Sequence, residues 1–275
     1  MSQPPAPLSA EQTTPGADPD VVLQEYLGII QRTIAHHPRS LQAAIGPSEV
    51  GQPCARRIGY RLLGKPQRDQ EPNWKAAIGT AVHSWLERAF DRENLRQAND
   101  LDGQERWLVE TRLTVGSTAT LGTIEGSCDL YDRATGTVID HKIVGPSQLR
   151  HYRADGPGQQ YRWQAHLYGH GWQLAGHPAE TVAICFLPRN GDLRDAYLWH
   201  EPYDAHIALD ALRRLEGIAT TCQILGDEAL QLLPTAQQFC ALCPWYQAGS
   251  TDPATGCPGH DMPLPESRPP LTLIK

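Results

Sequence analysis

The spacing of apolar positions changes along the chain from a helical period to a strand period. Apolar side chains first recur every three or four residues, which predicts three helices. These helices are expected at 20–37, 54–64 and 73–90, with Asp18 and Asn73 as capping candidates. The period then becomes two, and the tight-turn sequence RATG precedes the last run, which predicts an antiparallel β-meander. Its strands are expected at 106–115, 122–132 and 136–144.

The rest of the pattern adds two long helices and two strands. They are expected at 158–176, 181–188, 194–201 and 204–225. Beyond Pro234 the chain has no period and is rich in Cys, Pro and Gly. We therefore expect an α/β fold in which helices flank a central mixed β-sheet, with a small Cys-rich lobe built from both ends of the chain. The expected segments are a disordered tail at 1–20, a main domain at 21–233, a Cys-rich segment at 234–262 and a C-terminal tail at 263–275.

Composition indicates the class of protein and its cellular setting but does not identify a binding partner. A chain of 275 residues with 40% hydrophobic and 20% charged residues can bury a full core. No apolar run approaches the roughly 18 residues of a membrane span, and the first residues do not read as an export signal. Seven cysteines in such a chain indicate a reduced, cytoplasmic setting. The net charge of −7 leaves nucleic-acid binding open, because a local basic groove would survive that average.

The hairpin expected at 122–144 carries charged residues where burial penalises them. Asp129 lies in its first strand and Asp140 in its second, and Lys142 follows Asp140 on the same strand face. A hard divalent cation such as Mg²⁺ or Mn²⁺ would hold two carboxylates together and activate a water molecule, while the lysine assists the attack. These groups serve phosphodiester hydrolysis, although a solvated hairpin can carry the same residues by chance.

In these residues the sequence resembles the PD-(D/E)xK nucleases, whose hairpin carries Asp and then Asp/Glu-x-Lys. The matching residues are Asp129, Asp140 and Lys142, and the backbone carbonyl of His141 or Ile143 is a possible further ligand. The resemblance implies a restriction-endonuclease-like core with a metal-dependent catalytic centre.

Two further motifs resemble the RecB-like branch of these nucleases. The sequence GTAVHSWLE places His83 where that branch has a metal ligand, and QAHLY places Gln164 and Tyr168 one helical turn apart as substrate-positioning residues. Their ordinary alternatives are a half-exposed helical histidine and a polar helix seam. Glu110 is either a further acidic group at the site or an outward-facing strand residue.

Four cysteines resemble those of the iron-sulfur subgroup of RecB-like nucleases, which includes the CRISPR-associated protein four family and the AddB nuclease domain. That resemblance implies a 4Fe-4S cluster bound by Cys54, Cys240, Cys243 and Cys257. The thirteen residues between Cys243 and Cys257 depart from the short gap of that subgroup. The alternative is a zinc knuckle of Cys240, Cys243, Cys257 and His260, which would leave Cys54 without a role. The other cysteines, Cys128, Cys185 and Cys222, are expected in the core.

Basic and aromatic residues near these motifs have two interpretations. Arg56, Arg57 and Arg61 follow Cys54 and could contact DNA phosphates, or they could form a solvated helix face. The tryptophans could stack on single-stranded bases, but core packing is the expectation for Trp74, Trp85 and Trp163.

The sequence as a whole predicts a metal-dependent DNA exonuclease. The resemblance implies action on single-stranded DNA or DNA ends in recombination, repair or CRISPR-type processing, with a protein partner from such a system. One alternative is a catalytically silent DNA-binding module that keeps the fold. The other is a zinc-knuckle interaction protein in which the acids of the hairpin are coincidental.

Overall fold

The computed structural model describes residues 19–36, 44–68, 73–97, 104–236 and 240–260. The tails expected at 1–20 and 263–275 lie outside the described residues, apart from residues 19 and 20. The chain divides into two units, the first of residues 1–42 and 71–74 and the second of residues 43–70 and 75–275. The first unit contains α1, Pro19–Ala35, which confirms the helix expected there.

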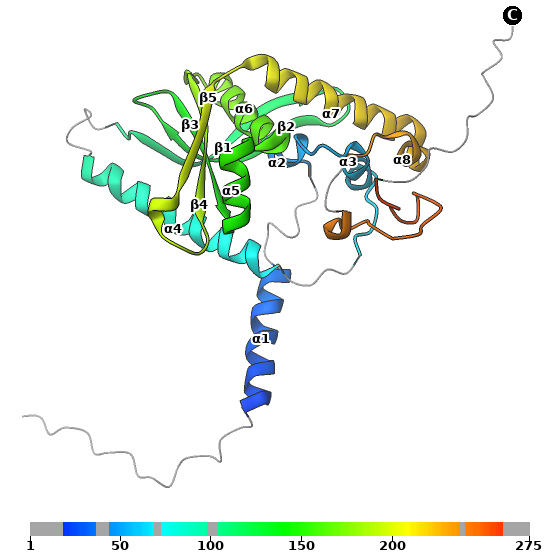
Figure 1. Ribbon diagram of the computed structural model, residues 1–275. Helices are drawn as coiled ribbons and strands as arrows, with labels where there is room; N and C mark the ends of the chain where they lie inside the picture. The colour runs from blue at the N-terminus through cyan, green and yellow to red at the C-terminus, as the bar shows by residue number, and fades with distance from the viewer. Residues whose placement is uncertain (1–18, 37–43, 69–72, 98–103, 237–239, 261–275) are drawn as a thin grey trace, which may run out of the picture. The chain divides into compact units, whose positions relative to one another are not determined.

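The second unit is built on a five-stranded mixed sheet, so the expected α/β class with a central mixed sheet is confirmed (Figure 1). Its strands are β1 Trp107–Thr118, β2 Gly122–Asp132, β3 Thr137–Val144, β4 Thr181–Pro188 and β5 Tyr197–Pro202. They lie in chain order, and each neighbouring pair is antiparallel except the parallel pair β3 and β4. The β-meander that the alternating pattern predicts is therefore present as β1 to β3.

The helices agree with the expected order and add shorter ones. They are α2 Pro47–Val50, α3 Ala55–Leu62, α4 Trp74–Gln97, α5 Pro146–Asp155, α6 Gly158–Leu174, α7 Ala205–Leu225 and α8 Ala229–Leu232. The helix α5 was not expected, because Leu149 is its one buried residue and its sequence has no apolar stripe. The strand expected at 194–201 begins later, since the short 3₁₀ turn η3, Leu193–Asp195, precedes β5 and is capped by Asp192. None of the described helices combines the length and apolar character needed to cross a lipid bilayer.

The helix α6 packs directly on the sheet, and α7 packs on both α6 and β1 (Figure 1). Gly171 makes this close approach possible, because a Cβ there would lie 3.2 Å from both Leu113 and Val115 of β1. Trp172 is buried and stacks on Tyr131 of β2 with ring centroids 4.4 Å apart. This packing fixes the height and rotation of α6, and with them the side chains it points at the sheet.

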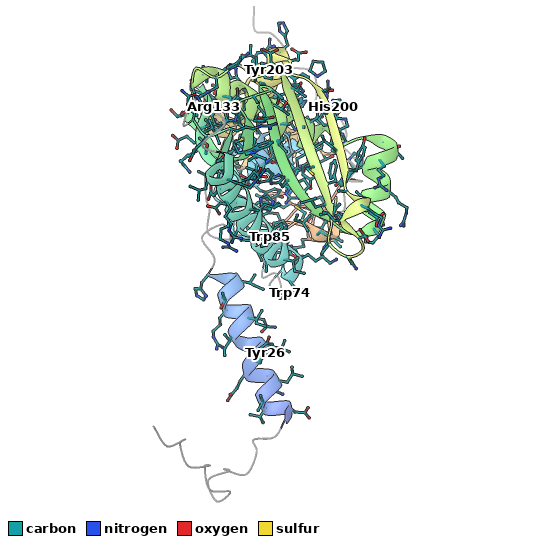
Figure 2. The ribbon with its side chains drawn as sticks, turned by 90° about the vertical axis from the view of Figure 1, so that its left-hand side faces the viewer. Tyr26, Trp74, Trp85, Arg133, His200 and Tyr203 are labelled. Carbon is teal, nitrogen blue, oxygen red and sulfur yellow. The ribbon has the colours of Figure 1, made fainter. Side chains whose placement is uncertain are left out.

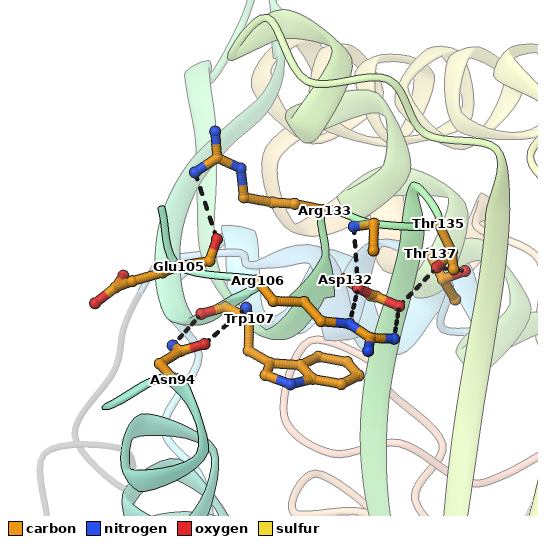
Figure 3. Close-up of polar contacts among 9 residues, drawn as sticks. Asn94, Glu105, Arg106, Trp107, Asp132, Arg133, Thr135 and Thr137 are labelled. Carbon is orange, nitrogen blue, oxygen red and sulfur yellow. Dashed lines mark hydrogen bonds and ion pairs between the residues drawn. The ribbon is translucent and has the colours of Figure 1, made fainter. Parts of the chain in front are cut away.

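The turn between β2 and β3 is held by the carboxylate of Asp132 (Figure 3). This carboxylate accepts two hydrogen bonds from Arg106 at 2.8 and 2.9 Å, one from Ala134 N–H and one from the Thr135 hydroxyl. Gly136 has φ of 65°, a left-handed conformation that glycine adopts without strain. The turn therefore sets the register of the hairpin, which runs through Tyr131↔Val138 and Leu130↔Ile139.

Asn94 ties the second half of α4 to the first residue of β1 (Figure 3). Its amide donates to the carbonyl of Trp107 at 2.7 Å and accepts from Trp107 N–H at 3.0 Å. Phe90, one turn earlier, packs against the Trp107 ring with centroids 5.1 Å apart. These contacts hold the face of α4 that carries Phe90 and His83 toward the sheet.

We expect Asn94→Ala to lower the free energy of unfolding by about 2 kcal/mol, because it leaves two partly buried backbone groups of Trp107 without their partner. Urea denaturation measures this change. Gln104→Ala is the matched control: its amide oxygen accepts from Arg133 at the surface, and its loss is expected to cost less than about 0.5 kcal/mol. Equal stability of the two variants would show that Asn94 does not anchor α4.

The tryptophans of α4 correct an expectation from the apolar pattern. Trp74 and Trp85 are 58% and 60% exposed, and Figure 2 shows both side chains on the outside of the structure. The reason is the rotation of α4: His83 turns toward the sheet, and a residue two positions later points to the other side of a helix. Trp163 is partly buried against the core, in agreement with the expected packing.

Candidate active site

The two acids of the hairpin lie side by side where β2 and β3 separate. The last pair of the β2–β3 ladder is Leu130↔Ile139, and Asp129 and Asp140 are the next residues beyond it. Asp129 is 8% exposed and Asp140 is 3% exposed. One Asp129 oxygen accepts from the backbone N–H of His141 at 2.7 Å, so this carboxylate bridges the two strands. The structure thus brings both predicted acids to one buried place.

Both oxygens of Asp140 are engaged by predicted site residues. One accepts from the amide of Gln164 on α6 at 2.9 Å, and the other lies 2.6 Å from the Lys142 ammonium group. The same ammonium lies 4.9 Å from the centre of the Tyr161 ring, a favourable cation–π distance. Lys142 is therefore held between a carboxylate and an aromatic face.

His83 reaches the same place from α4. Its Nδ1 atom lies 3.4 Å from one oxygen of Asp129, and within the described part of the chain this buried nitrogen has no hydrogen bond of normal geometry. A buried polar atom without a partner is costly unless something else binds it. The gap between the imidazole nitrogen and the carboxylate therefore fits a shared cation.

The ring of His141 is a feature that the sequence argument missed. The sequence indicates only the backbone carbonyl of His141 as a metal ligand, since alternation points its side chain away from Asp140 and Lys142. In the structure, His83, Asp129 and His141 each offer one ligand atom, and these atoms lie within 4.8 Å of one another. Asp140 is not part of this closest set, because its oxygens face Lys142 and Gln164. The sequence carries no signal for this ring, because alternation assigns it to the opposite face of the strand.

Burial and charge shift the pKa values of the site in opposite directions. Burial, reinforced by the charge of Asp129 and opposed by Lys142, raises the pKa of Asp140 to about 6. Burial also acts on Asp129, but His83 and Lys142 outweigh it and lower its pKa to about 2. Burial lowers the pKa of His141 to about 4. For His83, burial lowers the pKa but Asp129 outweighs it, so the pKa is raised.

These shifts describe a site suited to a cation. At neutral pH Asp129 is ionised and His141 is neutral, which are the forms in which carboxylate and imidazole bind a metal ion. The pKa of Asp140 is raised chiefly by burial, which disfavours the charged carboxylate, and further by the charge of Asp129. A divalent ion near these residues would favour the ionised form.

Tyr168 and Glu110 lie around this centre. Tyr168 is 5% exposed, and burial with the nearby charge of Asp140 raises its phenol pKa. Glu110 lies in β1 between the pairs Val109↔Leu130 and Thr111↔Cys128, at the level of Asp129. Its φ of 42° is a left-handed conformation that costs energy for a residue with a side chain. The backbone of β1 is thus distorted beside the site.

The four cysteines of the predicted cluster line a single cavity. Cys54 precedes α3, while Cys240, Cys243 and Cys257 come from the end of the described chain. Among the described residues, no three of these thiols approach within 4.8 Å of one another, and His260 Nδ1 lies 3.0 Å from the Thr235 hydroxyl. Cys128 and Cys222 are buried and Cys185 is half-buried, in agreement with core positions.

Charged side chains surround the loop that carries Cys54. Arg214 of α7 donates to the carbonyls of Val50, Gln52 and Pro53, which fixes this loop. Arg57 lines the cysteine cavity. Burial raises the pKa of the Cys243 thiol, and the positive charge of Arg57 opposes that rise.

The three arginines after Cys54 occupy different environments. Arg57 and Arg61 line a second cavity of about 260 Å³ together with Gln160 and Trp245, and Arg61 pairs with Glu49 at 2.5 Å. Arg56 is only 6% exposed, and its Nε and Nη1 atoms have no hydrogen-bond partner among the described residues. The side chain of Arg56 is therefore directed inward, unlike those of Arg57 and Arg61.

No protein-family model matches the chain, and no curated protein matches it. Similar solved structures include SSO0001, at 15% identity and a TM-score of 0.44, covering 83% of this chain and 93% of that one. They also include LHK-Exo in complex with dAMP, at 13% identity and a TM-score of 0.34, covering 68% and 93%. A third is a phage-related exonuclease from Haemophilus somnus 129PT, at 12% identity and a TM-score of 0.34, covering 65% and 80%. No residue's role is taken from these likenesses.

Proposed function

We propose that this protein is a divalent-metal-dependent DNA exonuclease of the PD-(D/E)xK type. The observation that supports this most strongly is the convergence of Asp129, Asp140, His83 and Lys142 at one buried place, from two strands and a helix. Their order along the chain and the Asp-x-Lys spacing are those that the resemblance implies.

Each residue of the centre has a distinct proposed role. His83, Asp129 and Asp140 hold Mg²⁺ or Mn²⁺, which when bound supplies Lewis acidity and positive charge near the scissile phosphate. Lys142 orients the attacking water molecule and stabilises charge on the phosphate oxygens. Gln164 fixes the Asp140 carboxylate through its hydrogen bond, and Tyr168 positions the DNA strand beside that carboxylate.

The DNA strand is proposed to approach along the cavity that Arg57 and Arg61 line. Gln160 lies in this cavity and is one helical turn before Gln164 on α6, so the cavity leads toward the catalytic residues. Guanidinium groups bind phosphate through paired hydrogen bonds. Because Arg56 is buried, the proposed phosphate contacts are those of Arg57 and Arg61.

We further propose that the four cysteines bind a 4Fe-4S cluster with a structural role. A zinc ion at about 2.3 Å from each thiolate would bring them within about 4 Å of one another. The thiolates of a four-iron cluster lie farther apart because each binds a different iron atom. The place of Cys54 in the same cavity as Cys240, Cys243 and Cys257 favours the cluster over the zinc knuckle, which would leave Cys54 without a role. Such a site needs reduced thiols, as in a cytoplasmic protein.

Digestion of end-labelled DNA tests the nuclease proposal. Single-stranded and double-stranded substrates with one protected end are incubated with the full chain and Mg²⁺ or Mn²⁺. Stepwise release of nucleotides from free ends that stops on adding a chelator supports a metal-dependent exonuclease. Binding of the same DNA without cleavage under any of these conditions would instead support the silent DNA-binding module. We also propose that the nuclease acts with a protein partner from a recombination or CRISPR-type system.

Cleavage is expected to fall as the pH drops through about 6. Asp140 must be ionised to act, and burial raises its pKa to about 6, whereas Asp129 with a pKa of about 2 stays ionised throughout. Protonation of Asp140 should therefore reduce kcat/KM about tenfold per pH unit below that point. The pH profile of kcat/KM is measured at low Mn²⁺ between about pH 4.5 and 8. Melting curves over the same range exclude unfolding as the cause of any loss. A flat profile would contradict the role of Asp140.

A further inference from the structure

We infer that the imidazole of His141 is an additional ligand of the divalent cation, so that the site selects Mn²⁺ over Mg²⁺. This inference rests on the proposed metal centre and specifies its ligand set. The residue between the Asp and the Lys of the strand would then contribute its side chain rather than only its backbone.

The position of the ring is the first argument. A ligand atom of His141 lies within 4.8 Å of ligand atoms of both His83 and Asp129, and this is the one such set of three among the described residues. Two ligands of one ion at about 2.1 Å each lie at most about 4.2 Å apart, so small side-chain movements close the remaining distance. The His141 residue is only 6% exposed, which leaves little water to compete for its nitrogens.

The packing of the ring is the second argument. Phe90 stacks on the face of His141 with an interplanar angle of 13°, while His83 meets it at 69° with centroids 6.0 Å apart. Phe90 and His83 are seven residues apart on α4, so one face of this helix contacts the ring twice. The backbone of the residue is fixed as well, because its N–H donates to Asp129. The ring is therefore held in place before any cation arrives.

A purely structural role for His141 explains less. An apolar side chain would pack against Phe90 equally well and would bring no polar nitrogens into a buried position. A histidine here is costly unless its nitrogens bind something, and the nearest groups are a second imidazole and a carboxylate.

The ligand chemistry gives the selectivity. Mg²⁺ prefers oxygen ligands and keeps its water shell, whereas imidazole nitrogens suit transition metals. With His141 added, two imidazoles join the carboxylates of Asp129 and Asp140, and these nitrogen ligands disfavour Mg²⁺ relative to Mn²⁺. A site with His83 as its single imidazole would discriminate less.

Pulsed electron paramagnetic resonance of Mn²⁺ bound to the full chain tests this directly, since it detects nitrogen nuclei coupled to the metal. We expect two imidazole couplings in the wild type and one in His141→Leu, with [¹⁵N]histidine labelling confirming their source. Calorimetric titration should show Mn²⁺ affinity falling about 10–100-fold in this variant, and Mg²⁺ affinity by less than about threefold. His151→Leu, at an exposed position of α5, is the matched control and should keep both couplings.

The outcomes are separable from those of the nuclease assay. A wild-type spectrum with a single imidazole coupling, or unchanged Mn²⁺ affinity in a folded His141→Leu protein, overturns the inference even if DNA is cleaved. His141→Phe keeps an aromatic ring against Phe90 and serves if the leucine variant does not fold. Two couplings in a wild-type protein that cleaves no DNA support the His141 ligand and contradict the proposed nuclease.

Discussion

Asp129→Asn is expected to lower DNA cleavage by at least about 10³-fold, the largest effect of any single substitution at the site. Asp129 combines two tasks, because one oxygen faces His83 and the other accepts from the backbone of His141 across the hairpin. The asparagine keeps the shape but loses the charge that the cation requires. It also turns one oxygen into a donor that meets the His141 N–H or His83, so the geometry of the site is disturbed as well.

Single-turnover cleavage and Mn²⁺ titration measure the two consequences of this substitution separately. Mn²⁺ affinity should fall together with cleavage, since the ligand set loses the charge of one of its two carboxylates. Asp192→Asn removes a carboxylate from an exposed surface pair with Arg194 and should leave both quantities unchanged. Full cleavage by Asp129→Asn would show that the hairpin acids are coincidental.

Cys54→Ser is expected to abolish iron incorporation and to lower the melting temperature by about 10 °C. The reason is chain entropy: a cluster that joins Cys54 to Cys240 closes a long loop, and losing such a closure costs about 4 kcal/mol by analogy with a disulfide. Iron and sulfide analysis of anaerobically purified protein and calorimetry measure these effects. Cys185→Ser, a half-buried thiol outside the cavity, should retain the iron.

The same variants separate the cluster from the zinc knuckle. If zinc is held by Cys240, Cys243, Cys257 and His260, then His260→Ala releases the metal and Cys54→Ser does not. If a cluster is bound, the reverse holds. Stoichiometric zinc with no iron in the wild type would contradict the cluster whatever the variants do.

Much of the fold follows from periodicity, because each predicted element has one apolar face that another element must cover. The change to a period of two predicts β1 to β3, and their pairing places Tyr131 across from Val138 with both side chains buried in the core. The helix α6 carries Gln164 to the sheet because its small residue Gly171 allows close contact with β1. The helix α5 could not be predicted, since a helix with one buried residue leaves no periodic signal in the sequence.

The candidate site could be predicted only as far as strand alternation and motif order reach. Asp129, Asp140 and Lys142 follow from the hairpin register, which the turn at Asp132 sets. The ring of His141 could not be predicted, because alternation assigns it to the opposite face and only the divergence of the strands brings it near Asp129.

Tertiary contacts also decide side-chain directions that the sequence leaves open. The rotation of α4 depends on contacts of Asn94 and Phe90 with Trp107, so the exposure of Trp85 could not be read from the spacing of apolar residues. Arg56, by contrast, is turned inward as helical spacing requires, because it shares a face of α3 with the buried Tyr60, whereas Arg57 and Arg61 lie one turn apart on another face.

The most direct test of the catalytic centre is a comparison of the wild type with Lys142→Met in one experiment that measures both Mn²⁺ binding and DNA hydrolysis. Lys142 pairs with Asp140 but is not itself a proposed metal ligand, so its loss should lower DNA hydrolysis and leave Mn²⁺ binding intact. We predict that the wild type binds Mn²⁺ and degrades DNA, and that Lys142→Met binds Mn²⁺ while hydrolysis falls by about 10²-fold or more. Hydrolysis at the wild-type rate by Lys142→Met, or none by the wild type with bound Mn²⁺, would contradict the account.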